Sequence, residues 1–325
     1  MSYIQKLKPD IAIGLADIPH GTTPGTKRIA KMSDRTLEWL MDHLKQKTDD
    51  QAIFAPILTV DLQSQWEYLD RLADDIADEI DGLALYDSNI LPDIPATTVL
   101  AALPRLSLDE PASPHQILRQ ISLGMDIFTI PFIGFATDAG IALSFRFPEP
   151  LPTEAAVENE TGSNVLPLGI DMWETSHAIS LKPLSESCTC YACISHHRAF
   201  VQHLLSAKEM LGWVLLQVHN HHVLSTFFTS IRESIQAGTF EKDCDVFAKA
   251  YESELPAKSG QGPRVRGYHY KSEGPNEGKK NKAAWGNLGG DDQEVGGGLV
   301  PDVAALKLEE KGFAAKVEDE KTPSS

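Results

Sequence analysis

The stretch CTCYACISHHRAFVQHLLSAKEMLGWVLLQVHN, residues 188–220, decides how the second half of the chain folds. It holds three of the four cysteines within six residues, a spacing that favours a metal over a disulfide framework in a chain of this size. Three thiolates and one imidazole form a closed tetrahedral set, which is typical of a structural Zn²⁺. We therefore predict one structural zinc ion, bound by Cys188, Cys190, Cys193 and a histidine; the alternative is three buried thiols without metal.

Composition alone does not identify the fourth ligand, because this region is rich in histidine. The candidates are His196, His197, His203, His219, His221 and His222. The helical pattern around them runs from residue 194 to about 252, so we place the metal-binding segment at residues 186–252. Cys244, the cysteine outside the cluster, is expected to be a buried free thiol.

Beyond Leu255 the composition changes. Eleven of the 23 glycines lie between residues 260 and 298, among lysine runs and few apolar residues. We expect residues 256–325 to be a mostly disordered Gly/Lys-rich tail with one short helix near 302–311.

Short apolar runs alternate with helical patterns in the first half of the chain. The runs, which are typical of buried strands, cover residues 10–18, 52–60, 81–86, 98–103 and 126–131. Helical patterns fill residues 34–47, 62–77 and 113–124. This alternation implies right-handed crossovers and parallel pairing, so the choice lies between a doubly wound sheet and a (β/α)₈ barrel.

The net charge is −17, with 46 acidic against 29 basic residues. Neutralising many phosphates requires clustered Lys and Arg, so overall charge argues against a protein that binds nucleic acid by itself. A local patch in the tail is a candidate for RNA contact: Arg264, Arg266, Lys271, Lys279, Lys280 and Lys282. With no run of 18 apolar residues and no secretory signal at its start, the protein is expected to be cytoplasmic.

The 188–220 stretch is similar to the zinc segment of the tRNA-guanine transglycosylases, which has C-x-C-x₂-C, R-A-[YF], E-M-L-G and the ligand histidine in H-N. This resemblance covers roughly residues 8–255 and selects His219 as the fourth zinc ligand. Family members are (β/α)₈ TIM-type barrels that exchange a guanine in the anticodon of certain tRNAs for a modified base, queuine in eukaryotes. The implied fold for residues 1–255 is such a barrel, lacking about three N-terminal β/α units because only five strands are found.

The family motif G-[VI]-D-M-F-D-C-x-x-P-T-R carries the nucleophile as its second aspartate. Here residues 124–132 read GMDIFTIPF, so Asp126 matches the first aspartate and Thr129 stands at the nucleophile position. A carboxylate is ionised at neutral pH and can form a glycosyl intermediate, whereas a threonine hydroxyl needs a base. The odd separation of Asp126 and Thr129 places their side chains on opposite faces of a strand. The resemblance therefore implies no catalytic residue in this chain.

Three further positions concern the base and the RNA. Residues 130–133, IPFI, replace the basic end of the motif and remove a cation. Asp81 stands in DGLA where the family usually has GGLA in its base pocket, and we expect its side chain to crowd or repel a base. Asp17 lies near a base-reading aspartate of active members, although a carboxylate that caps a loop explains it equally well.

The zinc motif and the lost nucleophile together imply a non-catalytic subunit of a queuine-inserting enzyme. It would form a heterodimer with a catalytic subunit, contact tRNA through the complex, and be cytoplasmic or peripheral on the mitochondrial outer membrane. In the family the zinc-bearing helices lie near the subunit interface, and here the candidates for contact or core packing are Phe200, Leu204, Leu211, Trp213 and Leu215.

Two other functions remain open. One is an active transglycosylase that uses Asp126 or Asp17 as its nucleophile. The other is a zinc-stabilised scaffold without a role on tRNA.

Overall fold

The structure is a computed structural model that describes residues 2–19, 24–48, 50–94, 98–148 and 165–263. Most of the predicted Gly/Lys-rich tail lies outside the described residues. The same is true of the helix predicted near 302–311 and of the basic patch that begins at Arg264.

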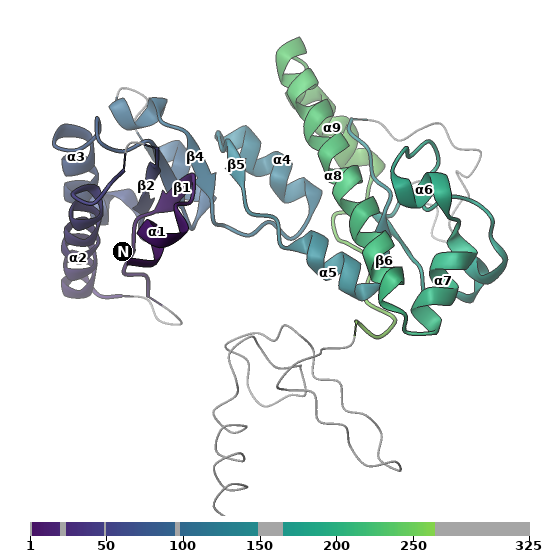
Figure 1. Ribbon diagram of the computed structural model, residues 1–325. Coiled ribbons are helices and arrows are strands. Elements are labelled where there is room, and N and C mark those ends of the chain that lie inside the picture. The colour runs from purple at the N-terminus through teal and green to yellow at the C-terminus, as the bar shows by residue number, and fades with distance from the viewer. Residues whose placement is uncertain (1, 20–23, 49, 95–97, 149–164, 264–325) are drawn as a thin grey trace, which may run out of the picture.

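Five short strands form one parallel sheet whose spatial order follows the chain order (Figure 1). They are β1 (Ile11–Ile13), β2 (Ala52–Ile57), β3 (Gly82–Leu85), β4 (Arg105–Ser107) and β5 (Ile127–Phe128). A doubly wound sheet reverses its strand order at a switch point, whereas a barrel winds in one direction. The five described strands show no such reversal, and this part of the chain forms a curled parallel half-barrel.

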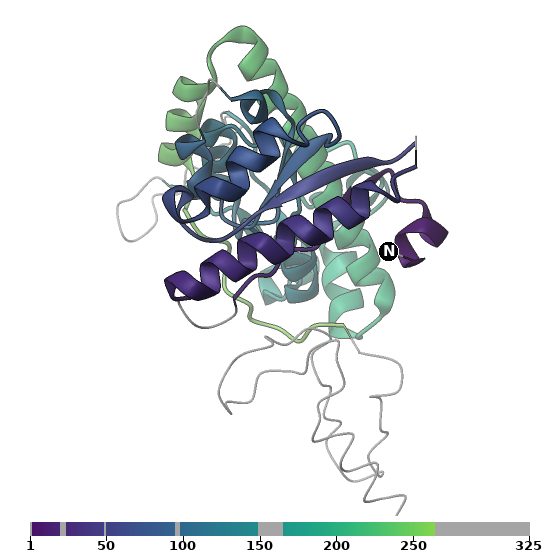
Figure 2. The ribbon, with the colours of Figure 1, turned by 90° about the vertical axis from the view of Figure 1, so that its left-hand side faces the viewer.

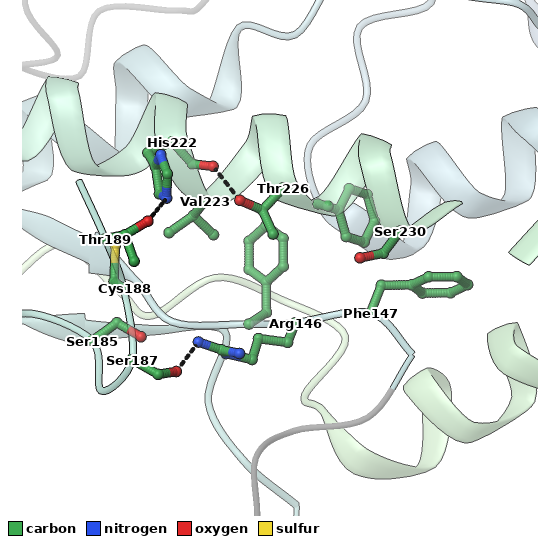
Figure 3. A pocket seen from close by; sticks show the side chains of 12 residues that line it. Arg146, Phe147, Ser185, Ser187, Cys188, Thr189, His222, Val223, Thr226 and Ser230 are labelled. Carbon is green, nitrogen blue, oxygen red and sulfur yellow. Dashed lines mark hydrogen bonds between the residues drawn. The ribbon is translucent and has the colours of Figure 1, made fainter. Parts of the chain in front are cut away.

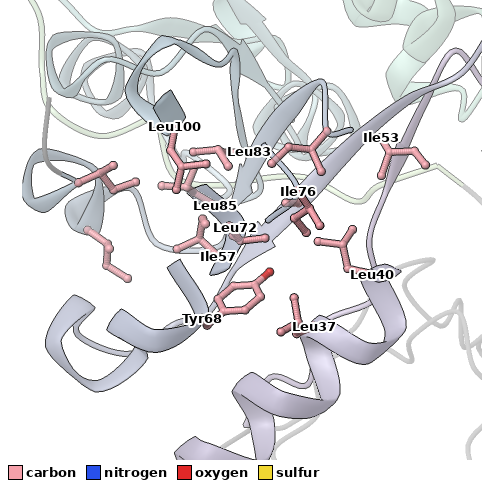
Figure 4. Close-up of a cluster of buried hydrophobic side chains, with 14 of the residues drawn as sticks. Leu37, Leu40, Ile53, Ile57, Tyr68, Leu72, Ile76, Leu83, Leu85 and Leu100 are labelled. Atoms are coloured by element: carbon pink, nitrogen blue, oxygen red, sulfur yellow. The ribbon is translucent and has the colours of Figure 1, made fainter. Parts of the chain in front are cut away.

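Helices cover one face of this sheet. After α1 (Ser2–Leu7), the helices α2 (Thr26–Leu44) and α3 (Trp66–Asp74) pack on β2 and β3. Side chains of a strand alternate between faces, so Ile53, Ala55 and Ile57 point into this layer while Phe54 points to the other face. Figure 4 shows the hydrophobic cluster between the sheet and these two helices, in which Leu40, Tyr68 and Leu72 contact the strand side chains.

The second face carries a smaller cluster of Phe54, Ala84 and Leu106. It corresponds to the interior side of a barrel wall, which is filled by strand side chains instead of helices.

The fourth strand differs from the prediction. Residues 98–103 contain a 3₁₀ helix, η3 (Val99–Ala102), and the strand follows Pro104 at Arg105–Ser107. Leu83 pairs with Arg105, so the ladder requires residues that lie later than the apolar run. The run is apolar because Leu100 fills the core between the sheet and α3, and not because it pairs.

The helix boundaries agree with the prediction to different degrees. Two further 3₁₀ helices, η1 (Leu62–Gln65) and η2 (Ser88–Asp93), precede α3 and follow β3. Helix α4 (Pro114–Leu123) agrees with the predicted 113–124. Helix α2 begins eight residues before the predicted start at 34, because Ser33 and Asp34, which resemble a helix cap, lie inside it.

The remainder is a helical lobe built on a two-stranded antiparallel ribbon (Figures 1 and 2). The lobe contains the helices predicted for residues 194–252 and, before them in the chain, the ribbon, which was not predicted. Its elements are α5 (Phe132–Ala139), β6 (Ile141–Leu143), β7 (Gly169–Asp171), η4 (Thr175–Ile179), α6 (Tyr191–Ser195), α7 (Arg198–Ser206), α8 (Met210–Ala237) and α9 (Phe240–Ala250). The 28-residue α8 contacts α5, α6, α7, α9 and β6 and so organises the lobe. Among the described helices, none is long and apolar enough to cross a membrane.

Candidate metal centre

The three clustered cysteines and His219 come together as predicted. Cys188 lies in the turn before α6, Cys190 caps that helix, Cys193 lies within it, and His219 comes from α8. The four ligand atoms lie within 4.8 Å of one another, and three of the four residues are buried while Cys188 is half-buried. The His219 Nδ1 atom is 3.6, 3.5 and 3.4 Å from the Sγ atoms of Cys188, Cys190 and Cys193. This cluster could hold a metal ion.

The backbone of β6 orients the histidine. The second ring nitrogen, Nε2, lies 2.8 Å from the carbonyl oxygen of Leu143. A carbonyl can only accept, so Nε2 carries a proton and donates, and Nδ1 is the nitrogen that faces the sulfurs. The ring is thereby held in the orientation in which Nδ1, once deprotonated, can bind a metal.

The other candidate histidines have different partners. His196 stacks on Phe200 at 4.9 Å between ring centroids, and His197 caps α7 by accepting from the Phe200 amide. His221 contacts Gln217, and His222 contacts Thr189. Of the described histidines, His219 alone belongs to the cysteine cluster.

Asn220, which the sequence reasoning passed over except as part of H-N, joins α8 to β6. Its Oδ1 accepts from the Leu143 amide at 2.9 Å, and its Nδ2 donates to the Ile141 carbonyl and to Thr137 Oγ1, both at 3.0 Å. The residue is fully buried, so each of these groups depends on it for a partner. Consecutive residues His219 and Asn220 thus bind the two ends of the same short strand.

Two more residues of the quoted stretch shape the site. Arg198 donates from Nε to the Pro183 carbonyl at 2.8 Å and from Nη2 to the Leu184 carbonyl at 3.2 Å, which holds the chain leading into the cysteine turn. Gly212 lies where α8 passes α7, and a Cβ atom there would be 3.1 Å from the Cδ2 atom of Leu205. These contacts give Arg198 and Gly212 a structural role in the quoted stretch.

The protons of the metal-free cluster are shared among its members. A hydrogen bond with Cys193, together with burial, raises the pKa of Cys188 to about 11, and the same bond lowers the pKa of Cys193. Burial by itself would lower the pKa of His219, but hydrogen bonds with Cys188 and Cys190 outweigh it and raise that pKa to about 9. A dication favours the deprotonated ligands and would displace these protons.

The position of the family's nucleophile lies at the carboxyl end of β5. Thr129 is exposed, and its hydroxyl donates to the Ser107 carbonyl at 3.1 Å. Asp126 lies at the opposite, amino end of the strand, where its carboxylate accepts from the Arg105 amide at 2.9 Å. The two side chains thus have different partners at opposite ends of β5.

Other carboxylates near the strand ends hold loops. Asp17 pairs with Arg28 at 2.6 Å and with Arg35, which favours the loop-holding role over base reading. Asp109 accepts from the amide and hydroxyl of Ser88. Asp81 lies at the amino end of β3, where it accepts from the Ile53 amide and pairs with Lys47 at 2.6 Å. Its carboxylate is thus held by its own partners, and the expectation that it crowds a base stays a prediction.

The apolar residues proposed for subunit contact divide into two groups. Leu204, Trp213 and Leu215 are buried in the core beside the metal cluster, and Phe200 packs against that core. Only Leu211 of the five is exposed, and it continues along α8 into Val214 and Val218, which are also exposed.

A parallel half-barrel joined to a Cys₃His helical lobe defines the class of protein. The chain belongs to the tRNA-guanine transglycosylase family, since the family model described as Queuine tRNA-ribosyltransferase matches residues 1–253.

The individual relatives are more specific. The chain is 37% identical over 292 residues to a Schizosaccharomyces pombe protein named "Queuine tRNA-ribosyltransferase accessory subunit 2", a match that covers 87% of this chain and 62% of that protein. Proteins of the same name match from Ixodes scapularis (38% over 152 residues, 44% of this chain and 37% of the relative) and Xenopus laevis (29% over 280 residues, 75% and 67%). The chain thus spans about three-fifths of the length of the S. pombe relative.

Proposed function

We propose that this chain is a non-catalytic accessory subunit of a queuine tRNA-ribosyltransferase, working with a catalytic subunit that exchanges guanine for queuine at the anticodon wobble position of tRNA. The names of the relatives support this function. The observation that carries it is Thr129, whose hydroxyl stands at the family's nucleophile position and donates to a backbone carbonyl. A hydroxyl in that role has no base to activate it for attack on a ribose.

The geometry argues against the alternative nucleophiles. Asp126 lies at the amino end of β5, away from the end where barrel enzymes bind substrate, and it is engaged by Arg105. Asp17 is held between two arginines that support its own loop. Either carboxylate would have to leave these partners before it could attack.

The proposed partner is the catalytic subunit, in a heterodimer that uses α8. Leu211, Val214 and Val218 are spaced three and four residues apart, which places them on one stripe of the helix. Their side chains are 47%, 51% and 40% exposed. Removing such a stripe from water stabilises an interface, and an apolar contact centre is typical of permanent complexes.

The proposed metal is one structural Zn²⁺ held by Cys188, Cys190, Cys193 and His219. Zn–S bonds of about 2.3 Å and a Zn–N bond of about 2.0–2.1 Å at a tetrahedral angle place sulfur and nitrogen about 3.5 Å apart. The observed separations of 3.4–3.6 Å fit these values. Four protein ligands complete the coordination of such an ion, so its role here is to fix α6 against α8.

Three further parts of the proposal concern the whole protein. The half-barrel is taken as part of a (β/α)₈ barrel with its remaining units on the N-terminal side. The complex, and not this chain alone, is taken to bind tRNA. The location is cytoplasmic, including peripheral attachment to the mitochondrial outer membrane.

The deciding experiment measures exchange of labelled guanine or queuine into tRNA. It compares this chain alone, the catalytic subunit of the same organism alone, and their mixture. We expect this chain alone to be inactive and the mixture to exceed the catalytic subunit alone. Thr129→Ala and Asp126→Asn should leave the rate of the mixture unchanged, because neither residue is the nucleophile.

Other outcomes identify the alternatives. Exchange by this chain alone, abolished by Asp126→Asn or by Asp17→Asn, would make it an active transglycosylase. A mixture that is no faster than the catalytic subunit and forms no complex with it would favour the zinc-stabilised scaffold.

A further inference from the structure

A cavity of about 230 Å³ lies beside the metal cluster and plays no part in the function proposed above (Figure 3). Its walls come from α8, from the chain that follows β6, and from the turn that carries Cys188. The lining residues are Phe145, Arg146, Phe147, Ser185, Ser187, Cys188, Thr189, His222, Val223, Thr226, Phe227 and Ser230.

The polar part of this lining is suited to an anion. It contains five hydroxyl groups, the guanidinium of Arg146 and the imidazole of His222, but no carboxylate. Acidic residues outnumber basic ones by 46 to 29 in the whole chain, whereas this cavity is lined by an arginine and by no acidic residue. Guanidinium and hydroxyl groups are donors that phosphate oxygens accept from.

Arg146 is held in place while its charge stays uncompensated. Its Nη2 donates to the Glu186 carbonyl at 3.1 Å and to the Ser187 hydroxyl, and its backbone amide donates to the hydroxyl of Tyr251 at 3.1 Å. Within the described residues, Arg146 forms no ion pair. The side chain is only partly exposed, and a partly desolvated charge gains from a bound counter-ion.

The aromatic residues of the cavity are unsuited to stacking a base. Phe145, Phe147 and Phe227 are at most 6% exposed. Phe227 meets Phe145 at 5.2 Å and Phe147 at 5.8 Å between ring centroids, both edge to face. A nucleobase would need an open ring face, so these rings form an apolar floor under a polar rim.

We propose that this cavity binds a phosphate group, with Arg146 as its charge partner and the hydroxyls of Ser185 and Ser230 as further donors. The hydroxyls of Thr226 and Ser187 already donate to the carbonyls of His222 and Glu186. The phosphate site itself does not depend on the proposed function. The source of the phosphate does depend on the proposed function. For a subunit that contacts tRNA, the phosphate belongs to the tRNA backbone; the other source is a free phosphate compound. Cys188 belongs both to this cavity and to the metal cluster, so the metal ion positions one wall of the site.

The test uses the metal-loaded full chain and three variants: Arg146→Gln, Ser230→Ala and the control Arg232→Gln. Arg232 is an exposed arginine of α8 outside the cavity that contacts only its own helix, at the Phe228 carbonyl. Inorganic phosphate binding is measured by isothermal titration calorimetry. Binding of tRNA is measured by fluorescence anisotropy at several salt concentrations, for the chain alone and mixed with the catalytic subunit.

We expect Arg146→Gln to weaken phosphate binding at least about tenfold and Ser230→Ala to weaken it about threefold, with Arg232→Gln unchanged. For a backbone phosphate, Arg146→Gln should also weaken tRNA binding about tenfold and reduce the salt slope by about one. An Arg146-dependent effect on inorganic phosphate without one on tRNA would identify a free phosphate compound as the source.

The proposal is overturned if Arg146→Gln matches Arg232→Gln in both assays. Metal content and the unfolding transition of each variant show that it is folded; should Arg146→Gln not fold, Ser230→Ala decides by the same comparison. None of these measurements involves base exchange, so failure of the phosphate site and failure of the accessory function give different results.

Discussion

Asn220 makes three hydrogen bonds that no local pattern indicates. Its amide side chain bridges the Leu143 amide, the Ile141 carbonyl and Thr137, residues 77 to 83 positions earlier in the chain. Because its neighbour His219 donates to the Leu143 carbonyl, the two residues satisfy both polar groups of one strand residue. The ring of His219 is therefore held at Nε2, opposite the nitrogen that faces the cysteines.

Replacing Asn220 by leucine should destabilise the protein by about 2–4 kcal/mol, because it leaves the Leu143 amide and the Ile141 carbonyl buried without partners. The control Thr137→Val removes one partner of the amide while leaving its other two bonds, and should cost about 1 kcal/mol. Urea unfolding of the metal-loaded proteins measures both. Equal midpoints for the two variants would contradict this role of Asn220.

Acid should weaken metal binding. In the metal-free cluster the pKa of Cys188 is raised to about 11 and that of His219 to about 9, so both groups are protonated near neutral pH. Metal binding then displaces protons from at least these two groups, and affinity rises with pH because fewer protons compete. Calorimetry at about pH 7.5, in buffers of different ionisation enthalpy, counts the protons released.

Cys244→Ser, outside the cluster, should leave that proton count unchanged, while His219→Ala should abolish tight binding. An affinity that does not change between about pH 6 and pH 8 would show that the ligands are already deprotonated.

At the scale of elements, the crossing of α7 and α8 depends on the absence of a side chain at Gly212. A Cβ atom there would lie 3.1–3.3 Å from Leu205 Cδ2, Leu204 Cβ and the Leu205 amide nitrogen. Gly212→Val should therefore force the helices apart and destabilise the protein by about 2–3 kcal/mol.

The matched control is Gly134→Ala in α5. A Cβ atom at Gly134 meets nothing within 4 Å, so alanine should stabilise its helix by up to about 1 kcal/mol. Thermal unfolding distinguishes the expected loss of stability in Gly212→Val from the expected gain in Gly134→Ala. A neutral Gly212→Val variant would mean that the crossing yields without cost.

At the scale of the whole molecule, the exposed stripe of α8 should form the contact with the catalytic subunit. Val214→Glu places a charge at its centre and should weaken the heterodimer at least about tenfold, because the charge must be desolvated in the interface. Ile235→Glu is the control, since Ile235 is equally exposed, at 50%, near the other end of the same helix. Analytical ultracentrifugation of the mixtures measures the complex.

Both variants should retain the unfolding midpoint of the unchanged chain, because both side chains are exposed. If Val214→Glu weakens the heterodimer no more than Ile235→Glu does, the interface lies elsewhere on the molecule.

The sequence by itself determined the features that depend on spacing along the chain. The Cys₃His cluster, the helical lobe and the alternation of strands with helices follow from residue types at fixed intervals, which act through local geometry. Thr129 at the nucleophile position is likewise a matter of alignment within one short motif.

Only the tertiary structure decided what depends on contacts between distant residues. It set the single winding direction of the sheet and moved the fourth strand beyond Pro104, because pairing with β3 outweighs the apolar run. It placed Asp81 at the amino end of its strand through a bond to Ile53, 28 residues away. It also brought Arg146 to the turn before α6, about 40 residues along the chain, where a charge and five hydroxyls share one cavity. Such contacts arise from packing and pairing, and no interval in the sequence encodes them.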